Sequence, residues 1–422
     1  MNVLHLNTFA GGGTGRTAVN LSDLMSKRGH RSAVCCSTEV VPARGVPASW
    51  QIATTAKRTL RSMLADTLWK GSAQGESFIP DWTPGCPKPA QIVEAVGFQP
   101  DVIVAYWLGC FITTRELRAL QEATGAPLVW YMMDMAPFTG GCHYAFDCRG
   151  YEAACGRCPA VNSRSANDVS SRTLERRRSD TEAMDITFVA ASTHTADQCR
   201  RSAIARGKRT EVIPIFVDPD VFRPEEKKLV RDKLGIPREA TVFFFGAQSM
   251  NALRKGMPEL YEALDMLAAQ MDAEGKPRDS VFLAYAGGQT LYKRTLPFPS
   301  KHLGYLKGDA ALAEAYQAAD LFVSPSLEDS GPLMVNESVM CGTPVVSFEM
   351  GVAKDLAIEG QTGFLAALGD SRSLADALQR FLSLDSQARL TMADECRSLA
   401  MRLLTPEAHV TAFEQLFIEL TS

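Results

Sequence analysis

The sequence predicts an α/β protein made of two Rossmann-like, doubly wound domains with a cleft between them. Short apolar segments alternate along the chain with longer segments of helical periodicity, and the apolar ones include VLHL, DVIVAYW and TVFFFGA. Strands buried on both faces of a parallel sheet have this nearly continuous apolar composition. The alternation occurs twice, on either side of a proline-rich segment at residues 211–224, and 422 residues suffice for two or three domains.

The bulk composition is that of an ordinary soluble globular protein, with 46% hydrophobic and 22% charged residues. A net charge of −4 argues against a general nucleic-acid binder, and no apolar run approaches the ~20 residues that span a bilayer. Residues 1–10 lack the basic segment and the cleavage site of a signal peptide. Most of the eleven cysteines lie in ordinary elements, which indicates reduced thiols and a cytoplasmic location.

The chain begins with a predicted buried strand, VLHL, followed by a glycine-rich loop and a helix at residues 16–28. Residues 13–18 fit the pattern G-x-G-x-x-A, and Glu39 follows a second strand predicted at residues 32–36. This combination is a weak dinucleotide fingerprint, so a nicotinamide- or flavin-dependent enzyme is one interpretation. The other interpretation is a tight turn between a strand and a helix, because glycine is equally suited to a nucleotide-binding loop and to such a turn.

Residues 57–70 can form an amphipathic helix with apolar side chains on one face and lysines and arginines on the other. Such a helix either packs on its own domain or rests on anionic lipid headgroups at the inner face of the cell membrane. Residues 71–90 are rich in Gly, Ser and Pro and are predicted to form a loop. Phe78, Ile79 and Trp82 are the apolar groups of this loop that could face an acceptor.

Buried strands are predicted at residues 101–107 and 127–133, and Asp134 follows the second of them. Ligands of α/β sheets bind at the carboxyl ends of the strands, so Asp134 is a candidate site residue. A basic helix at residues 169–185 comes next, before a strand at residues 186–192. Its arginines are predicted to form a solvated face, with contact to an anionic acceptor as the alternative; they are Arg172, Arg176, Arg177 and Arg178.

Four cysteines cluster in a predicted loop at residues 138–160 with the spacing C-x5-C-x6-C-x2-C; they are Cys142, Cys148, Cys155 and Cys158. The final C-x2-C pair is typical of zinc knuckles, and four cysteines favour a closed structural site over a catalytic one. Two disulfides and four free thiols are the other interpretations. A structural zinc ion is therefore one candidate ligand of this loop.

The second half repeats the pattern of the first. Its strands are predicted at residues 241–247 and 281–288, and its helices after residue 256 and at residues 310–319, 374–381, 390–404 and 407–420. Prolines limit the flexibility of the chain near residue 216, so we place the domain boundary there, where a hinge would let two domains close on a ligand. The predicted domains are residues 1–215 and 216–404, with a C-terminal helix in residues 405–422.

Residues 321–348 form a strand, a polar loop, a helix, a glycine turn and another strand. Asp329 or Ser330 can cap the helix, whose first turn would hold Gly331 and Pro332. A strand whose loop leads into a helix N-terminus favours phosphate, because free N–H groups and the helix dipole point at the ligand. Carboxylates there would instead hydrogen-bond sugar hydroxyls. A capping acid plus a solvent-facing acid on the helix is the structural alternative.

This segment resembles the donor site of retaining GT-B glycosyltransferases of the family 4 type, which carry two Glu residues separated by seven positions. Here Glu337 is the second acid, Asp329 stands at the first position with Glu328 beside it, and CGTPVV follows. The segment PFTGGCHY and the cysteine cluster resemble a subgroup that makes surface polysaccharide. The resemblance covers most of residues 200–400 and parts of the N-terminal half.

The resemblance implies transfer of a sugar from a UDP-sugar or GDP-sugar to a saccharide or lipid-linked saccharide, with no catalytic metal or other cofactor. The implied catalytic residues are Asp134, Asp329, Arg254 and Lys255, and the two cations would stabilise the leaving diphosphate. The implied donor-binding residues are Gly12, Gly13, Glu328, Ser330, Gly331, Pro332, Leu333, Glu337 and Tyr305. Thr139 and His143 are the implied contacts to the acceptor or the sugar. For Tyr305, packing in the core is the alternative to stacking on the base.

Some positions depart from the family pattern. Met133 stands where the subgroup has a histidine, Gln248 stands where the family has an arginine, and Asp329 replaces a glutamate. These departures leave a third interpretation open, in which the chain is an inactive relative that serves as a scaffold.

Overall fold

A computed structural model describes residues 1–37, 40–42, 78–83, 85–288, 295–331 and 333–422. The chain forms two compact units. The first contains Met1–Ala191, Thr195–Ile213 and Val410–Ser422, and the second contains Ser192–His194 and Pro214–His409. The main division, between residues 213 and 214, lies close to the predicted boundary at 215–216.

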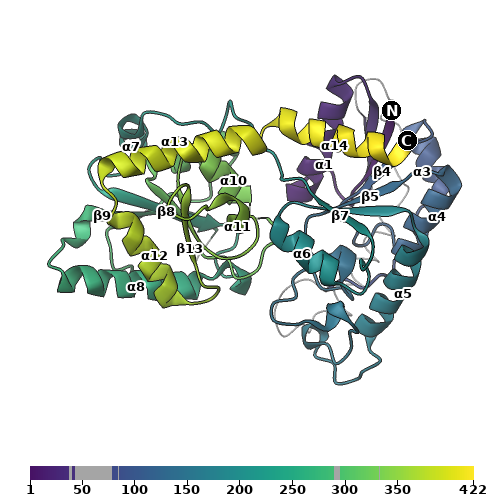
Figure 1. Ribbon diagram of the computed structural model, residues 1–422, viewed down its shortest axis with the longest axis horizontal. Coiled ribbons are helices and arrows are strands. Elements are labelled where there is room, and N and C mark those ends of the chain that lie inside the picture. Colours follow the sequence, from purple (N-terminus) through teal and green to yellow (C-terminus); the bar gives the residue numbers. More distant parts are fainter. Residues whose placement is uncertain (38–39, 43–77, 84, 289–294, 332) are drawn as a thin grey trace. The chain divides into compact units, whose positions relative to one another are not determined.

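The first unit has a twisted sheet with helices on both faces (Figure 1). Its strands are β1 (Asn2–Leu6), β2 (Arg31–Cys35), β3 (Val40–Pro42), β4 (Val102–Ala105), β5 (Leu128–Met132), β6 (Ile186–Ala190) and β7 (Arg209–Val212). Its helices are α1 (Gly12–Lys27), α3 (Pro89–Val96), α4 (Thr114–Thr124), α5 (Val169–Ala183), the part of α6 (Thr193–Arg201) that begins at residue 195 and the part of α14 (Pro406–Thr421) that begins at residue 410.

The strand order of this sheet is β3-β2-β1-β4-β5-β6-β7, and only the pair β2–β3 is antiparallel among the described strands. The order reverses at β1, because β2 lies on one side of it and β4 on the other. Asn7 follows β1 and Tyr106 follows β4, so both loops start at this switch point. Open α/β sheets bind ligands at such points, outside the carboxyl ends of the strands.

Alternating side chains of the first sheet face two different layers. Leu4, Ile103 and Trp130 belong to the core that also contains Ile92 of α3 and Leu117 of α4. On β5, Tyr131 follows Trp130 directly and contacts Phe413 of α14, with ring centroids 5.2 Å apart. Because neighbouring strand residues point to opposite faces, both faces are covered, as the continuous apolar strands predicted.

Helix α1 begins at Gly12, four residues earlier than predicted. Gly13 therefore lies in the first turn of the helix and not in a loop before it. Gly15 explains the early start, because a Cβ at this position would lie 2.4 Å from the carbonyl oxygen of Phe9. The absence of a side chain lets the helix approach the end of the preceding strand closely.

The second unit has its own sheet, again between layers of helices (Figure 1). Its strands are β8 (Thr241–Ala247), β9 (Val281–Gly287), β10 (Ser300–His302), β11 (Leu321–Ser324), β12 (Val345–Phe348) and β13 (Gly363–Ala366). Its helices are α7 (Lys227–Leu234), α8 (Met257–Ala273), α9 (Asp309–Ala318), α10 (Leu333–Met340), α11 (Ala353–Leu356), α12 (Ser371–Leu382), α13 (Ser386–Leu403) and the start of α14.

The order of the second sheet is β10-β9-β8-β11-β12-β13, and all its described pairs are parallel. Phe243 and Phe245 join a core with α8 and α12, whereas Phe244 joins a separate core with α9, α10 and α13. Strand alternation thus divides one run of phenylalanines between two layers. The order reverses between β8 and β11, which makes the carboxyl ends of these two strands the switch point of this unit.

Three predictions about individual residues were wrong. Gly331 lies before α10, which begins only at Leu333. Arg177 is 7% exposed and does not belong to a solvated face, because its guanidinium donates to the carbonyl oxygens of Ala136 and Thr139. Tyr305 is 56% exposed and is not packed in the core. The predicted helix at residues 57–70, Glu39 and Pro332 lie outside the described residues.

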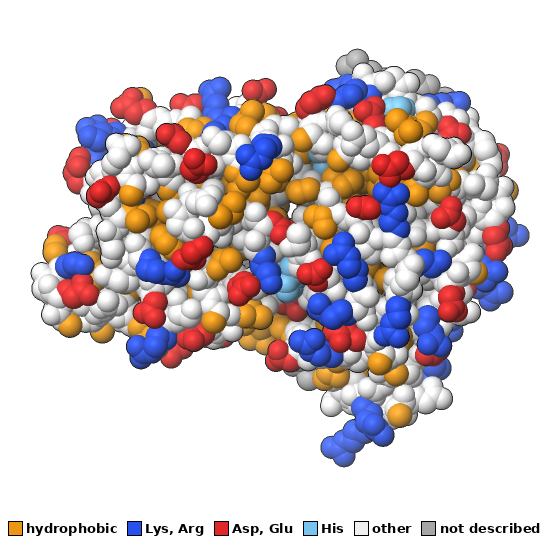
Figure 2. Space-filling view, viewed as in Figure 1, with side chains coloured by type: hydrophobic (Ala, Val, Ile, Leu, Met, Phe, Trp, Pro, Cys, Tyr) orange, Lys and Arg blue, Asp and Glu red, His pale blue; other side chains and the backbone are white. Residues whose placement is uncertain are grey.

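Among the described residues, no helix is both long and apolar enough to cross a membrane. The face shown in Figure 2 carries acidic and basic side chains in alternation, as expected for a chain with 44 basic and 48 acidic residues.

Candidate active site

Two loops meet at the switch point of the second sheet. The loop after β8 contains a single helical turn at Leu253–Lys255, and the loop after β11 contains Leu327 and Asp329. The amide of Leu327 donates to the carbonyl oxygen of Arg254 at 2.7 Å, and the amide of Glu328 lies 3.3 Å from the same oxygen. These backbone hydrogen bonds hold the two loops against each other, so side chains of one loop lie beside side chains of the other.

The loops bring two cations onto one carboxylate. Asp329 Oδ2 lies 2.6 Å from Lys255 Nζ and 2.9 Å from Arg254 Nη1, and all three side chains are mostly buried. Burial by itself would raise the pKa of Asp329, but Lys255 and Arg254 lower it below its usual value. Asp329 is therefore a carboxylate that holds two positive charges at the switch point.

Gly256 makes this arrangement possible. Its φ of +61° lies in the left-handed region, and a Cβ there would lie 1.8 Å from the carbonyl oxygen of Pro325. A side chain at this position would force the two loops apart. The glycine after Lys255 thus has a steric reason, since it lets the two loops approach closely enough for Lys255 to reach Asp329.

Glu337 lies on α10 and is 6% exposed. Its Oε2 accepts a hydrogen bond from the hydroxyl of Tyr316 on α9 at 2.9 Å. Burial, with the charge of Glu337 beside it, raises the pKa of Tyr316 well above its usual value, so this phenol remains a donor. Sequence reasoning missed Tyr316, because nothing in the pattern of α9 distinguishes it from an ordinary core tyrosine.

The other predicted donor residues of the second unit lie around the same loop. Glu328 and Ser330 are buried, with 5% and 3% exposure, and Ser330 accepts a hydrogen bond from the hydroxyl of Ser192 at its carbonyl oxygen. The amide of Gly331 donates to Asp329 Oδ1 at 3.3 Å, and Leu333 starts α10. Tyr305 lies on a different loop, after β10.

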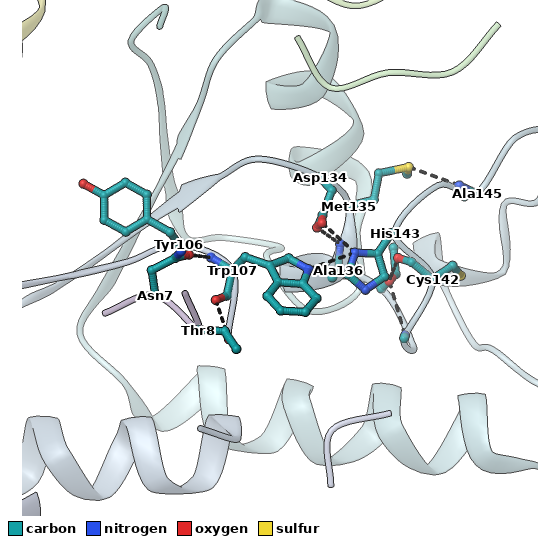
Figure 3. A network of polar contacts seen from close by, with 12 residues as sticks. Asn7, Thr8, Tyr106, Trp107, Asp134, Met135, Ala136, Cys142, His143 and Ala145 are labelled. Carbon is teal, nitrogen blue, oxygen red and sulfur yellow. Dashed lines mark hydrogen bonds and ion pairs between the residues drawn. The ribbon is translucent and has the colours of Figure 1, made fainter. Parts of the chain in front are cut away.

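In the first unit, Gly12 and Gly13 are exposed at the start of α1, and Gly12 has a φ of +76°. Asp134 and His143 form a buried pair at the carboxyl end of β5, with Asp134 Oδ2 2.6 Å from His143 Nδ1 (Figure 3). Thr139 is fully buried, and its hydroxyl donates to the carbonyl oxygen of Cys142 at 2.6 Å. Thr139 thus shapes the turn that carries His143.

Trp107 is the neighbour that sequence reasoning missed. Its indole nitrogen lies 3.3 Å from His143 Nδ1 (Figure 3). Its ring stacks on the ring of Phe9, with the centroids 5.9 Å apart. Its backbone amide donates to Asn7 Oδ1 at 3.0 Å, which joins the loops after β1 and β4. A signal was present, because Trp107 closes the apolar run DVIVAYW and therefore stands at the carboxyl end of a strand.

All eleven cysteines lie in the described part of the chain, and all are free thiols. Burial and the neighbouring Cys158, Cys155 and Cys148 raise the pKa of Cys142 to about 12. Among the described residues, no three His, Cys, Asp or Glu side chains are placed so that they could hold a metal ion. The side chains as placed therefore do not fit a zinc ion, and the structural zinc site stays a prediction of the sequence.

Asp168 fastens the end of the cysteine loop to α5. Its Oδ1 accepts from the amides of Ser170 and Ser171 and so caps the helix, and its Oδ2 accepts from the amide of Cys158 at 3.0 Å. Burial opposes ionisation of this carboxyl, but hydrogen bonds from Ser170, Cys158, Ser171 and Ser163 lower its pKa from 3.8 to about 2.

Asp168→Ala is expected to lower the free energy of unfolding by about 1–2 kcal/mol at pH 7, because the helix loses its cap and Cys158 loses its acceptor. A carboxyl with a lowered pKa stabilises the fold above its unfolded-state pKa, so the difference from wild type should shrink as the pH falls from 3.8 towards 2. Urea unfolding at several pH values measures both effects. Asp370→Ala is the matched control, since Asp370 caps α12 from an exposed position. Equal losses in the two variants at pH 7 would show that the Cys158 contact adds nothing.

Comparisons with known proteins give the family model and the solved structures that this chain resembles. Residues 239–384 match the family model described as glycosyl transferases group 1. Over 236 residues the chain is 28% identical to a D-inositol 3-phosphate glycosyltransferase of Xylanimonas cellulosilytica. This match covers 52% of this chain and 54% of the relative. The chain thus spans about half the length of the curated relatives that it matches.

Solved structures match over nearly the whole chain. The sucrose-phosphate synthase of Thermosynechococcus elongatus superposes with a TM-score of 0.66 at 17% identity, covering 99% of this chain and 98% of the other. The Anabaena HepE protein in complex with UDP and glucose superposes with a TM-score of 0.61 at 18% identity, covering 99% and 100%. The chain therefore has the fold of the GT-B glycosyltransferases, with two parallel-sheet α/β units, and its residues 239–384 match the group 1 glycosyl transferases.

Proposed function

We propose that this protein is a retaining, family 4 type glycosyltransferase that moves a sugar from a nucleoside-diphosphate sugar to a saccharide or lipid-linked saccharide. The observation that carries the proposal is the pair of cations, Arg254 and Lys255, held on Asp329 at the switch point of the second sheet. A diphosphate is negatively charged, like the carboxylate, and its oxygens can take over these contacts. The group 1 match supports the proposal, because residues 239–384 include all three side chains.

In the proposed mechanism, Arg254 and Lys255 stabilise the charge that develops on the leaving diphosphate. Glu337, buried and fixed by Tyr316, accepts hydrogen bonds from the ribose hydroxyls. Asp329 and the amides at the start of α10 hold the donor sugar. The bond from the sugar C1 to the phosphate oxygen breaks while the acceptor oxygen bonds to C1 on the same face, and the phosphate oxygen takes the hydroxyl proton. No protein nucleophile and no metal ion takes part in this scheme.

UDP is the first nucleotide to test, because a structurally similar protein, HepE, is described in complex with UDP and glucose. GDP is the alternative that the sequence leaves open. A role in surface polysaccharide synthesis, at the cytoplasmic side of the cell membrane, rests on the resemblance of the segment PFTGGCHY to that subgroup.

The test is a thermal-shift and calorimetric panel of UDP, GDP, NAD and their sugar conjugates. One nucleoside diphosphate is expected to stabilise the wild type, by about 2.7 kcal/mol at a hundredfold excess over its Kd. Glu337→Ala should abolish this shift. Glu337→Gln retains an acceptor for Tyr316 and separates the loss of ribose contacts from a loss of stability, and Glu274→Ala, on the surface after α8, is the control.

Three other outcomes of this nucleotide panel would contradict the proposed function or the role of Glu337. If no nucleotide binds the wild type, the donor site is wrong and the scaffold interpretation takes its place. Binding of NAD alone would favour a nicotinamide enzyme that uses the glycines of residues 13–18. An unchanged UDP shift in both Glu337 variants would remove Glu337 from the donor site.

A further inference from the structure

Tyr316 on α9 is a fully buried tyrosine whose ring is held from several sides. The ring meets Phe244 and Phe322 edge to face, with centroids 5.2 Å and 5.4 Å apart, and the ring of Phe222 lies at 6.4 Å. The carbonyl oxygen of Tyr316 accepts a hydrogen bond from the hydroxyl of Thr343 at 2.9 Å. Because the interior is close-packed, these contacts fix the direction of the phenol hydroxyl.

The hydroxyl points toward α10, where it donates to Glu337 Oε2 at 2.9 Å. Glu337 is 6% exposed, so this hydrogen bond joins two buried side chains. Burial, and then the charge of Glu337, raise the pKa of the Tyr316 phenol and of the Cys341 thiol above their usual values. Both groups therefore stay protonated, and Glu337 carries the negative charge among the three. A hydrogen bond to an ionised oxygen is about twice as strong as one between neutral groups.

Another fully buried tyrosine shows what a purely structural hydroxyl does. Tyr131 on β5 also contacts an aromatic ring, but its hydroxyl donates to the backbone carbonyl oxygen of Ile213 at 2.8 Å. Such a bond satisfies a buried hydroxyl without involving a charged group. The hydroxyl of Tyr316 instead contacts the carboxylate that the proposed mechanism assigns to the ribose. This difference points to a role of Tyr316 in the donor site.

We propose that Tyr316 is a positioning residue of the donor site, which holds the ionised carboxylate of Glu337 in one orientation toward the ribose of the nucleotide. The inference rests on the proposed function, in which Glu337 accepts hydrogen bonds from the ribose hydroxyls. A fixed carboxylate favours a sugar with two adjacent hydroxyls, because both can donate to it. A 2′-deoxyribose lacks one of these donors, which costs binding energy at a buried acceptor. The donor is therefore a ribonucleoside diphosphate sugar, and deoxyribonucleoside diphosphate sugars are disfavoured.

Calorimetric titration of the full chain with UDP, 2′-deoxy-UDP and pyrophosphate tests the proposal. Tyr316→Phe keeps the ring and its packing and removes only the hydroxyl, so the variant should fold. It should weaken UDP binding about tenfold, because the carboxylate loses the hydrogen bond that orients it, and should weaken 2′-deoxy-UDP binding less. Pyrophosphate has no ribose and reports on Arg254 and Lys255, so its affinity should not change. If the nucleotide panel selects GDP, GDP and 2′-deoxy-GDP replace the uridine compounds.

Steady-state rates with the nucleotide sugar that is turned over give a second readout. The ribose contact is the same in the ground state and in the transition state, so KM for the donor should rise about tenfold while kcat stays close to the wild-type value. Tyr131→Phe is the matched control, because it removes an equally buried phenol hydroxyl in the first unit. It should lower the thermal stability to a similar extent and leave every ligand affinity unchanged.

Four outcomes would overturn the proposal. Equal UDP affinity in the wild type and in Tyr316→Phe would show that the hydroxyl does not position Glu337. Equal weakening of UDP and pyrophosphate would show that the substitution disturbs the second unit as a whole. Equal weakening of UDP and 2′-deoxy-UDP would show that the effect does not pass through the ribose. A loss in kcat without a change in KM would exclude a role in donor binding.

The proposed function and the role of Tyr316 fail in different ways. If no nucleotide binds the wild type, the donor site itself is wrong, and this inference falls with it. If UDP binding is lost in Glu337→Ala but keeps its full affinity in Tyr316→Phe, the donor site stands and only the positioning role of Tyr316 is refuted.

Discussion

Lys255→Ala is expected to lower kcat for sugar transfer by about 10²–10³-fold, with a smaller effect on the affinity for the bare nucleotide. Lys255 Nζ and Arg254 Nη1 share Asp329 Oδ2, so the remaining cation still holds the ground-state charge of a diphosphate. The charge that develops as the glycosidic bond breaks is then met by one positive group where there were two. Preorganised charges aimed at a developing anion contribute rate factors of this order.

Steady-state rates with the donor identified in the nucleotide panel measure this effect. Lys276→Ala is the control, because Lys276 is an exposed lysine of the same unit that pairs only with a surface glutamate in the described ion pairs. Its rates should equal those of the wild type. If Lys255→Ala retains full kcat, Lys255 does not face the leaving group.

Asp329→Asn is expected to lower the free energy of unfolding by about 3–5 kcal/mol at pH 7. It leaves Arg254 and Lys255 mostly buried without their shared negative charge, and removal of one member of a buried ion pair has a cost of this size. Because the pKa of Asp329 is lowered in the folded chain, its stabilisation is present above the usual value of 3.8 and is lost as the pH falls below it. The difference from wild type should therefore shrink in acid.

Urea unfolding with and without ligand measures this prediction and also tests the role of Asp329. UDP should restore part of the lost stability, because its diphosphate replaces the missing charge. If Asp329 also holds the donor sugar, a UDP-sugar should stabilise the variant no better than UDP does. Asp232→Asn is the control, since Asp232 pairs with Arg238 on the surface and should change little. Unfolding of Asp329→Asn at the wild-type urea concentration would contradict the buried-pair interpretation.

Particular residues show which parts of the fold could be predicted from the sequence and which could not. The strands were predictable because burial on both faces demands apolar runs, and β8 agrees with its predicted bounds. The start of α1 was not predictable from the sequence, because a segment with four glycines is typical of a loop. Only the structure shows that Gly15 lies against the backbone of Phe9 inside a helix. Arg177 lies among other arginines on α5, and only the segments that pack against the helix show that it is buried.

For the candidate site, too, the sequence could propose some residues, whereas only the structure shows how they contact one another. Asp329, Glu337, Arg254 and Lys255 could be proposed from spacing and resemblance, because each lies in a loop or helix that follows a strand. That the two cations share one oxygen of Asp329 depends on the approach of two loops that are about 75 residues apart in the chain. Trp107 and Tyr316 were missed because their roles come only from their neighbours in space.

The sequence by itself determined the α/β architecture, the two repeats and the residue types at the carboxyl ends of the strands, because burial and helical periodicity are local properties of the chain. The tertiary structure alone decided which charges meet. It placed Lys255 and Arg254 on Asp329, and it paired His143 with Asp134. The physical reason is that hydrogen bonds and ion pairs depend on distances of a few ångströms between loops, and the order of the strands in the sheets sets those distances.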